Sequence, residues 1–235
     1  MTEEEIKLKE HINSGTSKTK NKTFDKNGYL LVRDIIDPQS LVCEVPDVRG
    51  IVKYGGSVDS YEHTPVEMQV NGSMARYNYP PYKEVYYKLK KRLESIIGED
   101  LYPTYYFDRF YFPGQELINH TDRDSCEISV SVHIRTNLKD PWPFWIKGCD
   151  TYNDDKSEVI EEGKVVSGDL NPGDGIIYKG CERPHWREPM PGVKRNKIRK
   201  LFGREELFYH QIFFHYVLAN GNRVHHAWDM QNKNK

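Results

Sequence analysis

The stretch TYYFDRFYFPGQELINHTD at residues 104–122 is the most informative part of this sequence. It begins with an aromatic, β-prone run, turns at Pro113 and Gly114, and ends with His120 and Asp122 separated by one residue. Residues i and i+2 of a β-strand project to the same face, so both side chains can reach one ion. The stretch therefore predicts a strand, a turn and two ligands of a metal site.

The chain after this stretch alternates apolar and polar residues with the period of a strand. In CEISVSVHIR (126–135), one face carries Ile128, Val130, Val132 and Ile134, and the other carries Ser129, Ser131, His133 and Arg135. Further strands are predicted at 143–148, at 164–168, after the turn in NPGDGIIYKG (171–180), and in FYHQIFFHYVLANG (208–221). Short strands with Gly and Pro between them, and no intervening helices, predict a mainly β sandwich or jelly roll.

The N-terminal part of the chain predicts supporting elements. Residues 81–100 carry apolar residues at helical spacing between a proline and a glycine, which predicts an amphipathic helix. FDKNGYLLVRDII (24–36) predicts a turn followed by a strand. Residues 46–80 show little pattern and predict a long loop or lid, because loops of that length in a compact domain are usually functional or mobile. Residues 1–22 are polar and predict a flexible lead.

Composition excludes several classes of function. The chain has 235 residues and a formal net charge of −1, so it has no global field to attract nucleic acid or an anionic membrane. The basic run KRNKIRK (194–200) is expected to be a solvated loop. The N-terminus lacks the apolar core of a signal peptide, and no run is long enough to span a membrane. Four cysteines without a Cys-x-x-Cys pair complete the expectation of a cytoplasmic protein with reduced thiols.

A third metal ligand is available well downstream, in CERPHWREP, where His185 lies between a proline and a tryptophan. Two histidines and one carboxylate form the set associated with non-haem Fe(II) sites that keep open positions. The alternative is coincidence, because the chain has nine histidines and a chance His-x-Asp is easily found. His133, His210 and His215 lie within predicted strands, where ordinary core or surface roles are equally open.

The segments YFPGQELINHTDRDSCEIS, LNPGDGIIYKGCERPHW and HQIFFHYV are similar to the 2-oxoglutarate- and Fe(II)-dependent oxygenases. The resemblance is nearest to the prolyl-hydroxylase-like branch and to small members from bacteria and phages. It covers roughly residues 102–220, the expected jelly-roll core of one domain spanning 23–235. It implies a double-stranded β-helix with supporting N-terminal helix, in which His120, Asp122 and His185 bind Fe(II). It also implies 2-oxoglutarate and O2 as co-substrates, with ascorbate as a stimulant.

The distal carboxylate of 2-oxoglutarate has to be paired with a buried cation. In the prolyl-hydroxylase pattern that cation opens the strand after the second histidine, but FYHQIFFHYV offers only His210 and Gln211 there. Arg135, which ends the polar face of 126–135, is the expected replacement, as in the asparaginyl-hydroxylase-like branch. The competing cations are Arg187, Lys179 and Arg109, and the expected supporting polar residues are Tyr111, Tyr105, Gln211 and Ser131.

The reaction implied by the resemblance is hydroxylation of an unactivated C–H bond. The resemblance favours a prolyl residue in a peptide, with a free amino acid or other small metabolite as the alternative. A cupin-type metal protein that does not use 2-oxoglutarate is the rival class, although such proteins usually carry His-x-His. Nucleobase demethylation is disfavoured because it needs a basic groove. The expected substrate-facing parts are residues 46–80 and 151–164, with Arg109, Trp186 and Arg187.

Overall fold

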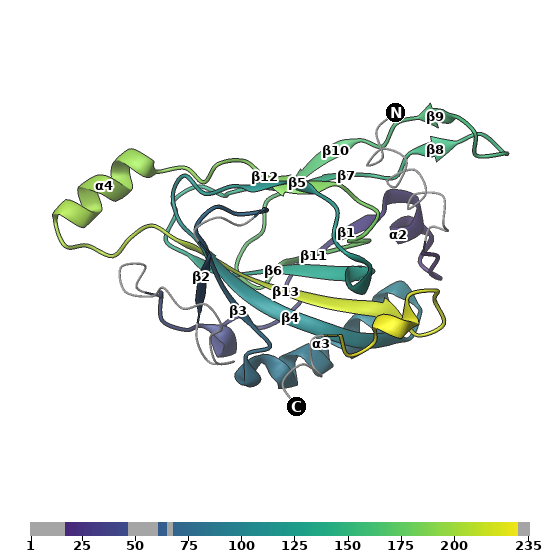
Figure 1. The fold of residues 1–235 in the computed structure, drawn as a ribbon, viewed down its shortest axis with the longest axis horizontal. Coiled ribbons are helices and arrows are strands. Elements are labelled where there is room, and N and C mark those ends of the chain that lie inside the picture. Colours follow the sequence, from purple (N-terminus) through teal and green to yellow (C-terminus); the bar gives the residue numbers. More distant parts are fainter. Residues whose placement is uncertain (1–16, 47–60, 65–67, 230–235) are drawn as a thin grey trace.

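The computed structural model describes residues 17–46, 61–64 and 68–229. Two antiparallel sheets lie face to face, as Figure 1 shows. The larger sheet has the order β1 (Tyr29–Val32), β11 (Gly175–Tyr178), β6 (Ile128–Thr136), β13 (Tyr209–Leu218), β4 (Leu101–Tyr111), β3 (Ser73–Tyr77) and β2 (Glu62–Thr64). The smaller sheet has the order β10 (Val165–Gly168), β7 (Phe144–Lys147), β12 (His185–Arg187) and β5 (Leu117–His120). The predicted jelly roll is confirmed.

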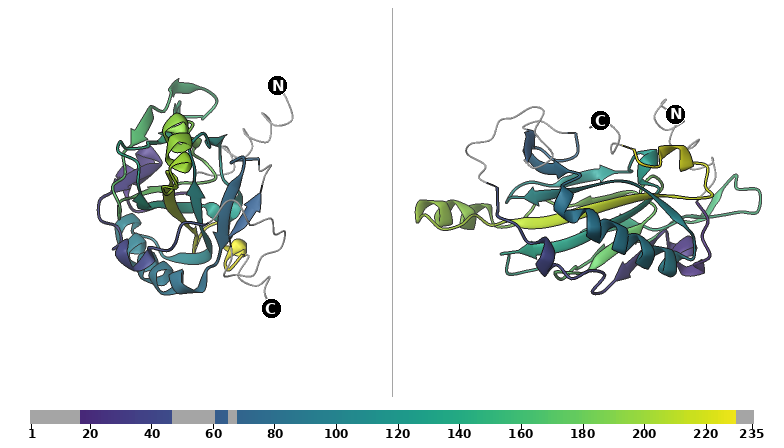
Figure 2. Two further views of the ribbon diagram at one scale, coloured as in Figure 1. Left: turned by 90° about the vertical axis from the view of Figure 1, so that its left-hand side faces the viewer. Right: turned by 90° about the horizontal axis from the view of Figure 1, so that it is seen from below.

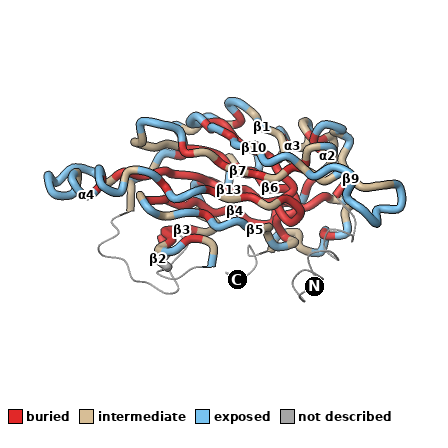
Figure 3. The backbone as a smooth tube through the Cα atoms, turned by 90° about the horizontal axis from the view of Figure 1, so that it is seen from above, coloured by how far each residue is buried: buried red, intermediate tan, exposed pale blue. Residues whose placement is uncertain are grey.

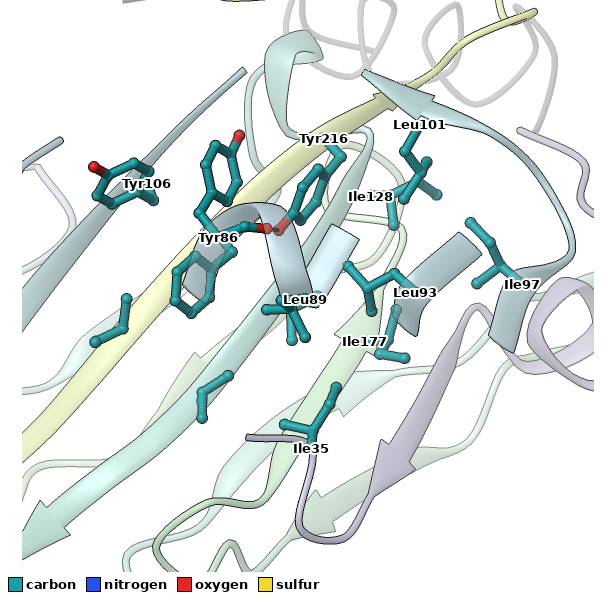
Figure 4. Close-up of a cluster of buried hydrophobic side chains, with 14 of the residues drawn as sticks. Ile35, Tyr86, Leu89, Leu93, Ile97, Leu101, Tyr106, Ile128, Ile177 and Tyr216 are labelled. Carbon is teal, nitrogen blue, oxygen red and sulfur yellow. Dashed lines mark hydrogen bonds between the residues drawn. The ribbon is translucent and has the colours of Figure 1, made fainter. Parts of the chain in front are cut away.

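Helix α3 (Lys83–Ile97) covers the outer face of the larger sheet, as the right-hand view in Figure 2 shows. Its buried residues Tyr86, Leu89, Leu93 and Ile97 recur at helical spacing and pack against apolar side chains of β6, β11 and β13 (Figure 4). The helix ends at Gly98, whose φ of 76° is a left-handed conformation that favours glycine. The amphipathic pattern of 81–100 thus correctly predicted both the helix and its end.

The alternation of β6 separates two buried regions. Ile128, Val130, Val132 and Ile134 face α3, whereas the side chains between them face the space between the sheets. That inner space is filled by a second apolar cluster to which both sheets contribute, including Tyr111, Phe144, Tyr178 and Phe213. Figure 3 shows the resulting buried backbone along β4, β6 and β13. Polar residues on these inner faces are therefore buried, and their groups need partners or ligands.

Two helices and one hairpin lie outside this sandwich. Helix α2 (Lys22–Asn27) precedes β1, and β8 (Thr151–Tyr152) pairs with β9 (Val159–Glu161) in an exposed hairpin. Helix α4 (Val193–Leu201) projects from the opposite end of the molecule (Figure 1). Short 3₁₀ turns complete the structure at Gln39–Leu41, Pro80–Tyr82, Asp124–Cys126 and Val224–His226.

Two predictions about loops were wrong. The basic run 194–200 is part of α4, which the Asn196 side chain stabilises by accepting a hydrogen bond from the Leu207 backbone. Part of the expected loop 46–80 forms β2 and β3, which extend the larger sheet beside β4. Strand pairing across the sheet, which no local pattern reports, overrode the weak local signal. Residues 47–60 and 65–67 of that segment lie outside the described residues.

Residues 17–22 of the lead predicted at 1–22 are attached to the domain. The buried Ser17 donates from its backbone to Glu182 and from its hydroxyl to Glu127. Lys179 donates to the Ser17 carbonyl, so residues from 17 onward belong to the domain. Residues 1–16 lie outside the described part of the chain. Among the described helices, none is long and apolar enough to cross a membrane.

Candidate metal centre

His120, Asp122 and His185 come together where β5 ends and β12 begins. The two strands pair antiparallel with His120 opposite His185. Oδ1 of Asp122 lies 3.5 Å from Nε2 of His120 and 3.6 Å from Nε2 of His185. One ligand atom from each residue falls within 4.8 Å of the others. Three such atoms around one point can hold a divalent cation.

Hydrogen bonds leave the right atoms of these three residues available. Nδ1 of His120 lies 2.8 Å from the Ile118 carbonyl, and Nδ1 of His185 lies 2.9 Å from the Arg183 carbonyl. A carbonyl can only accept, so Nδ1 carries the proton and Nε2 keeps its lone pair. Ser129 donates to Oδ2 of Asp122, which leaves Oδ1 as the ligand atom. The three residues are of the types that bind a metal, and their hydrogen bonds leave one ligand atom of each free to do so.

The electrostatics favour the protonation states that bind metal. Burial raises the pKa of Asp122, but His185 and His120 outweigh this and bring it below its usual value. Burial lowers the pKa of His185 to about 4, although Asp122 opposes the shift. At neutral pH the site therefore offers a carboxylate and a neutral imidazole, the forms required for coordination.

Asp122 lies just past the end of β5, so the expectation that both ligands sit on one strand was only half right. Its backbone N–H donates to the Gly180 carbonyl at 2.9 Å. A Cβ at Gly180 would lie 2.3 Å from the Cys126 carbonyl oxygen and 2.5 Å from Oδ2 of Asp122. Only glycine permits this approach, and nothing in the local sequence at 180 signals it.

A cavity of about 470 Å³ opens onto the three residues. Its wall is largely aromatic, with polar groups at a few points, as is typical of small-molecule sites. The lining residues besides the three are Met68, Gln69, Tyr77, Tyr105, Phe107, Arg109, Leu117, Arg123, Cys126, Tyr178, Phe213 and His215. Met68, Gln69 and Tyr77 come from the expected loop 46–80, whereas residues 151–164 contribute nothing to this wall.

No protein-family model and no curated protein matches the sequence. Among solved structures, HygX from Streptomyces hygroscopicus, with nickel and 2-oxoglutarate bound, aligns with TM-score 0.52 and 10% identity over 84% of this chain and 85% of its own. EctD from S. alaskensis, with 2-oxoglutarate and 5-hydroxyectoine, aligns with TM-score 0.53 and 13% identity over 83% and 74%. A Pseudomonas putida prolyl-4-hydroxylase aligns with TM-score 0.49 and 12% identity over 82% and 94%. This chain has the fold of the 2-oxoglutarate-dependent oxygenases.

In this oxygenase fold, the expected co-substrate residues divide into three groups. Tyr105 and Arg109 line the cavity. Tyr111, Gln211 and Ser131 are buried, and the Gln211 amide donates to the Ser131 hydroxyl. Arg135 lies apart from all of these, because its guanidinium donates to the Cys43 carbonyl at 2.9 Å and stacks 4.9 Å from the Phe208 ring centre. Phe208 belongs to a separate cluster with Tyr61 and Phe110, so the structure does not bring Arg135 to the site.

Trp186 and Arg187, next to His185, point in opposite directions. Trp186 is half-buried, stacks on Trp145 and donates to Glu188, so it turns away from the cavity. Arg187 is only 1% exposed, which places it on the inner face with His185. The alternation of a strand explains this difference and corrects the expectation that both would wall the site.

Arg187 is the centre of a buried aromatic cage. Its guanidinium carbon lies 4.6 Å from the ring centres of both Trp142 and Tyr209, and 5.4 Å from that of Phe144. It donates to the Trp142 carbonyl and, at 3.3 Å, to the Tyr209 hydroxyl. No carboxylate pairs with it among the described residues. A buried cation without an anion is costly, and this is the strongest signal in the fold of a missing anionic ligand.

Other buried polar atoms around this cage also have no partner within the described chain. They are the Tyr111 hydroxyl and Nε2 of His133, in addition to Nε of Arg187 itself. Tyr111 packs edge-on against Trp142 at 5.0 Å, and His133 stacks on Tyr209 at 4.1 Å, so both border the cage. The sequence reasoning left His133 as an ordinary strand residue and missed Tyr209 and Trp142. The polar inner face of 126–135 was the signal that could have found His133.

Proposed function

We propose that this protein is an Fe(II)- and 2-oxoglutarate-dependent dioxygenase that hydroxylates an unactivated C–H bond. The observation that carries this function is that β12 bears both a candidate metal ligand and a buried cation, two residues apart. His185 completes a two-histidine, one-carboxylate set, and Arg187 presents an unpaired buried cation on the same strand face. When bound, iron and 2-oxoglutarate supply the oxidising power that no side chain of the protein has.

His120, Asp122 and His185 would hold the iron. Three protein ligands leave positions open for the co-substrate, for oxygen and for the approach of the substrate. The Nδ1–H bonds to the carbonyls of Ile118 and Arg183 fix both imidazole rings before the metal arrives. The protein's contribution is to orient these groups and to exclude water from the cavity.

Arg187 would pair with the distal carboxylate of 2-oxoglutarate, in the place expected for Arg135. Residues i and i+2 of a strand are about 7 Å apart, a spacing that a five-carbon diacid can bridge. Tyr111 carries an unpartnered hydroxyl at the border of the same cage and would donate a hydrogen bond to that carboxylate. The aromatic walls keep water out, so the ion pair would be strong. Arg109, which lines the cavity itself, would face the substrate.

The substrate would be a peptidyl proline or a small metabolite such as a free amino acid. A cavity of about 470 Å³ has room for one residue or one small molecule. EctD, whose fold this chain shares, was solved with 5-hydroxyectoine, which supports a small molecule. Peptidyl proline rests on the sequence resemblance to prolyl hydroxylases.

The deciding experiment measures co-substrate binding and turnover separately. Protein loaded with Fe(II) without oxygen should bind 2-oxoglutarate and develop a visible metal-to-ligand charge-transfer band. With oxygen and ascorbate it should release succinate slowly alone and faster with the right member of a panel of free amino acids and proline peptides. The His185→Ala variant should lose the band, whereas Trp186→Ala, next to it on the outer face, should keep it. Metal-loaded protein that fails to bind 2-oxoglutarate would refute the function.

A further inference from the structure

His215 faces the metal cavity from β13, in a chain of contacts that begins at a metal ligand. Oγ of Ser129 lies 3.1 Å from Oδ2 of Asp122 and 2.9 Å from Nδ1 of His215. The same Oγ lies 3.2 Å from the Cys126 carbonyl. Ser129 and His215 are 0% and 2% exposed, so no water competes for these contacts from the bulk solvent.

The proton count of this chain fixes the tautomer of His215. A serine hydroxyl has one proton, and its neighbours Asp122 Oδ2 and the Cys126 carbonyl can only accept. Ser129 therefore donates its hydroxyl proton to one of these acceptors, most favourably to the charged carboxylate. Nδ1 of His215 must then be the donor to Ser129, which leaves Nε2 as an unprotonated acceptor.

Packing holds the His215 ring in place. Its centre lies 4.7 Å from that of Tyr105 and 5.7 Å from that of Phe107, with interplanar angles of 35° and 23°. Both aromatic residues line the cavity with His215. Nε2 is buried and has no hydrogen-bond partner among the described residues. A fixed, buried acceptor without a donor is rare in proteins and indicates a ligand group.

We propose that Nε2 of His215 is the acceptor that positions the prime substrate, and that this substrate carries a hydrogen-bond donor close to the carbon that is oxidised. The donor would be a hydroxyl, an amide N–H or an ammonium group. This inference rests on the proposed function, because it assigns the substrate side of the same cavity. It defines the substrate class further, since a purely apolar group would leave this buried Nε2 unsatisfied.

The rival interpretation is a second metal ion. Ligand atoms of Asp122, Cys126 and His215 lie within 4.8 Å of one another. However, Ser129 already occupies Oδ2 of Asp122, and Sγ of Cys126 lies 3.2 Å from the Tyr105 hydroxyl. Both groups are therefore hydrogen-bonded within the protein, whereas Nε2 of His215 alone is available.

The test reads the tautomer directly by long-range ¹H–¹⁵N correlation on protein labelled with ¹⁵N-histidine and loaded with Zn(II). His215 should be a neutral Nδ1–H tautomer, assigned by the loss of its signals in His215→Gln. Ser129→Ala should abolish this fixed tautomer, whereas Ser131→Ala, on the same strand face but bonded to Gln211, should preserve it. An Nε2–H tautomer in the unmodified protein, or two Zn(II) per chain, would overturn the proposal.

A second experiment measures the kinetics of succinate release with the panel of free amino acids and proline peptides. For any member that accelerates succinate release, His215→Leu should raise KM by about tenfold, and His215→Gln, which retains an acceptor, should recover most of the loss. Equal KM values for the Leu and Gln variants would count against the positioning role. An Nε2–H tautomer would refute the proposal even if the panel contains no substrate. Protein that binds neither Fe(II) nor 2-oxoglutarate would refute the proposed function instead, whatever the state of His215.

Discussion

His185 and Arg187 lie two residues apart on β12, and both side chains are buried on its inner face. One belongs to the three-residue metal set, and the other is a cation without a carboxylate partner in the described chain. A single short strand thus carries a candidate metal ligand and the best candidate for anchoring an anionic co-substrate. As the proposed anchor, Arg187 would lie on a different strand from the cation of the prolyl-hydroxylase pattern.

We expect Arg187→Met to weaken 2-oxoglutarate binding by about 30-fold or more, because a charge-assisted pair in a dry site contributes about 2–3 kcal/mol. Isothermal titration of Zn(II)-loaded protein would measure the dissociation constant. Arg135→Met is the matched control and should stay within about threefold, since Arg135 contacts Cys43 and Phe208 instead. The opposite ranking of the two variants would restore Arg135 as the anchor.

We expect Gly180→Ala to weaken metal binding and also to lower stability, because its Cβ would lie 2.3 Å from the Cys126 backbone carbonyl oxygen. The added Cβ would lie 2.5 Å from both Oδ2 of Asp122 and Oγ of Ser129, so the carboxylate would have to move. Gly203→Ala is the control, because no atom lies within 4 Å of its Cβ and only its positive φ opposes the change. Competition with a fluorescent chelator would give both affinities. Equal affinities would show that Asp122 tolerates the displacement.

We expect Asp108→Asn to destabilise the fold by about 3–5 kcal/mol, because it leaves a buried cation without its anion. Asp108 is 0% exposed and accepts from both Nε and Nη2 of Arg76 at 3.0 Å, with Nε2 of His210 also at 3.0 Å. Urea unfolding would measure the loss. The exposed Asp155→Asn should change stability by less than about 0.5 kcal/mol. A small loss at Asp108 would indicate that Arg76 finds other partners, such as the ring of Tyr79.

We expect the metal-free protein to lose stability as the pH falls from about 6.5 to about 4. Burial lowers the pKa of His133 to about 4, and that of His215 likewise. An unfolded histidine titrates near 6.5, so between these values the unfolded state binds more protons and acid favours it. His133→Gln should reduce the total loss by about 3 kcal/mol at most. Denaturation curves at several pH values would show this, and an unchanged pH slope would mean that His133 is not neutral in the fold.

Short-range patterns were enough to predict much of this protein. The period-2 alternation of 126–135 predicted β6, because a strand buried between a helix and a second sheet must alternate its two faces. Helical spacing and Gly98 predicted α3 to within a few residues. The sequence also predicted the three candidate ligands, because the segments around His120, Asp122 and His185 resemble the 2-oxoglutarate-dependent oxygenases.

Contacts between distant segments determine the surroundings of each side chain, which these local patterns do not report. Arg135 and Arg187 are both arginines at strand ends, and only the packing of Trp142 and Tyr209 around Arg187 distinguishes them. The role of Ser129 likewise depends on residues from three separate segments meeting within hydrogen-bond distance. Alternation reports which face a residue occupies, because that depends on its immediate neighbours. It cannot report what lies opposite that face, because the pairing and packing of the sheets are set by segments far away in the chain.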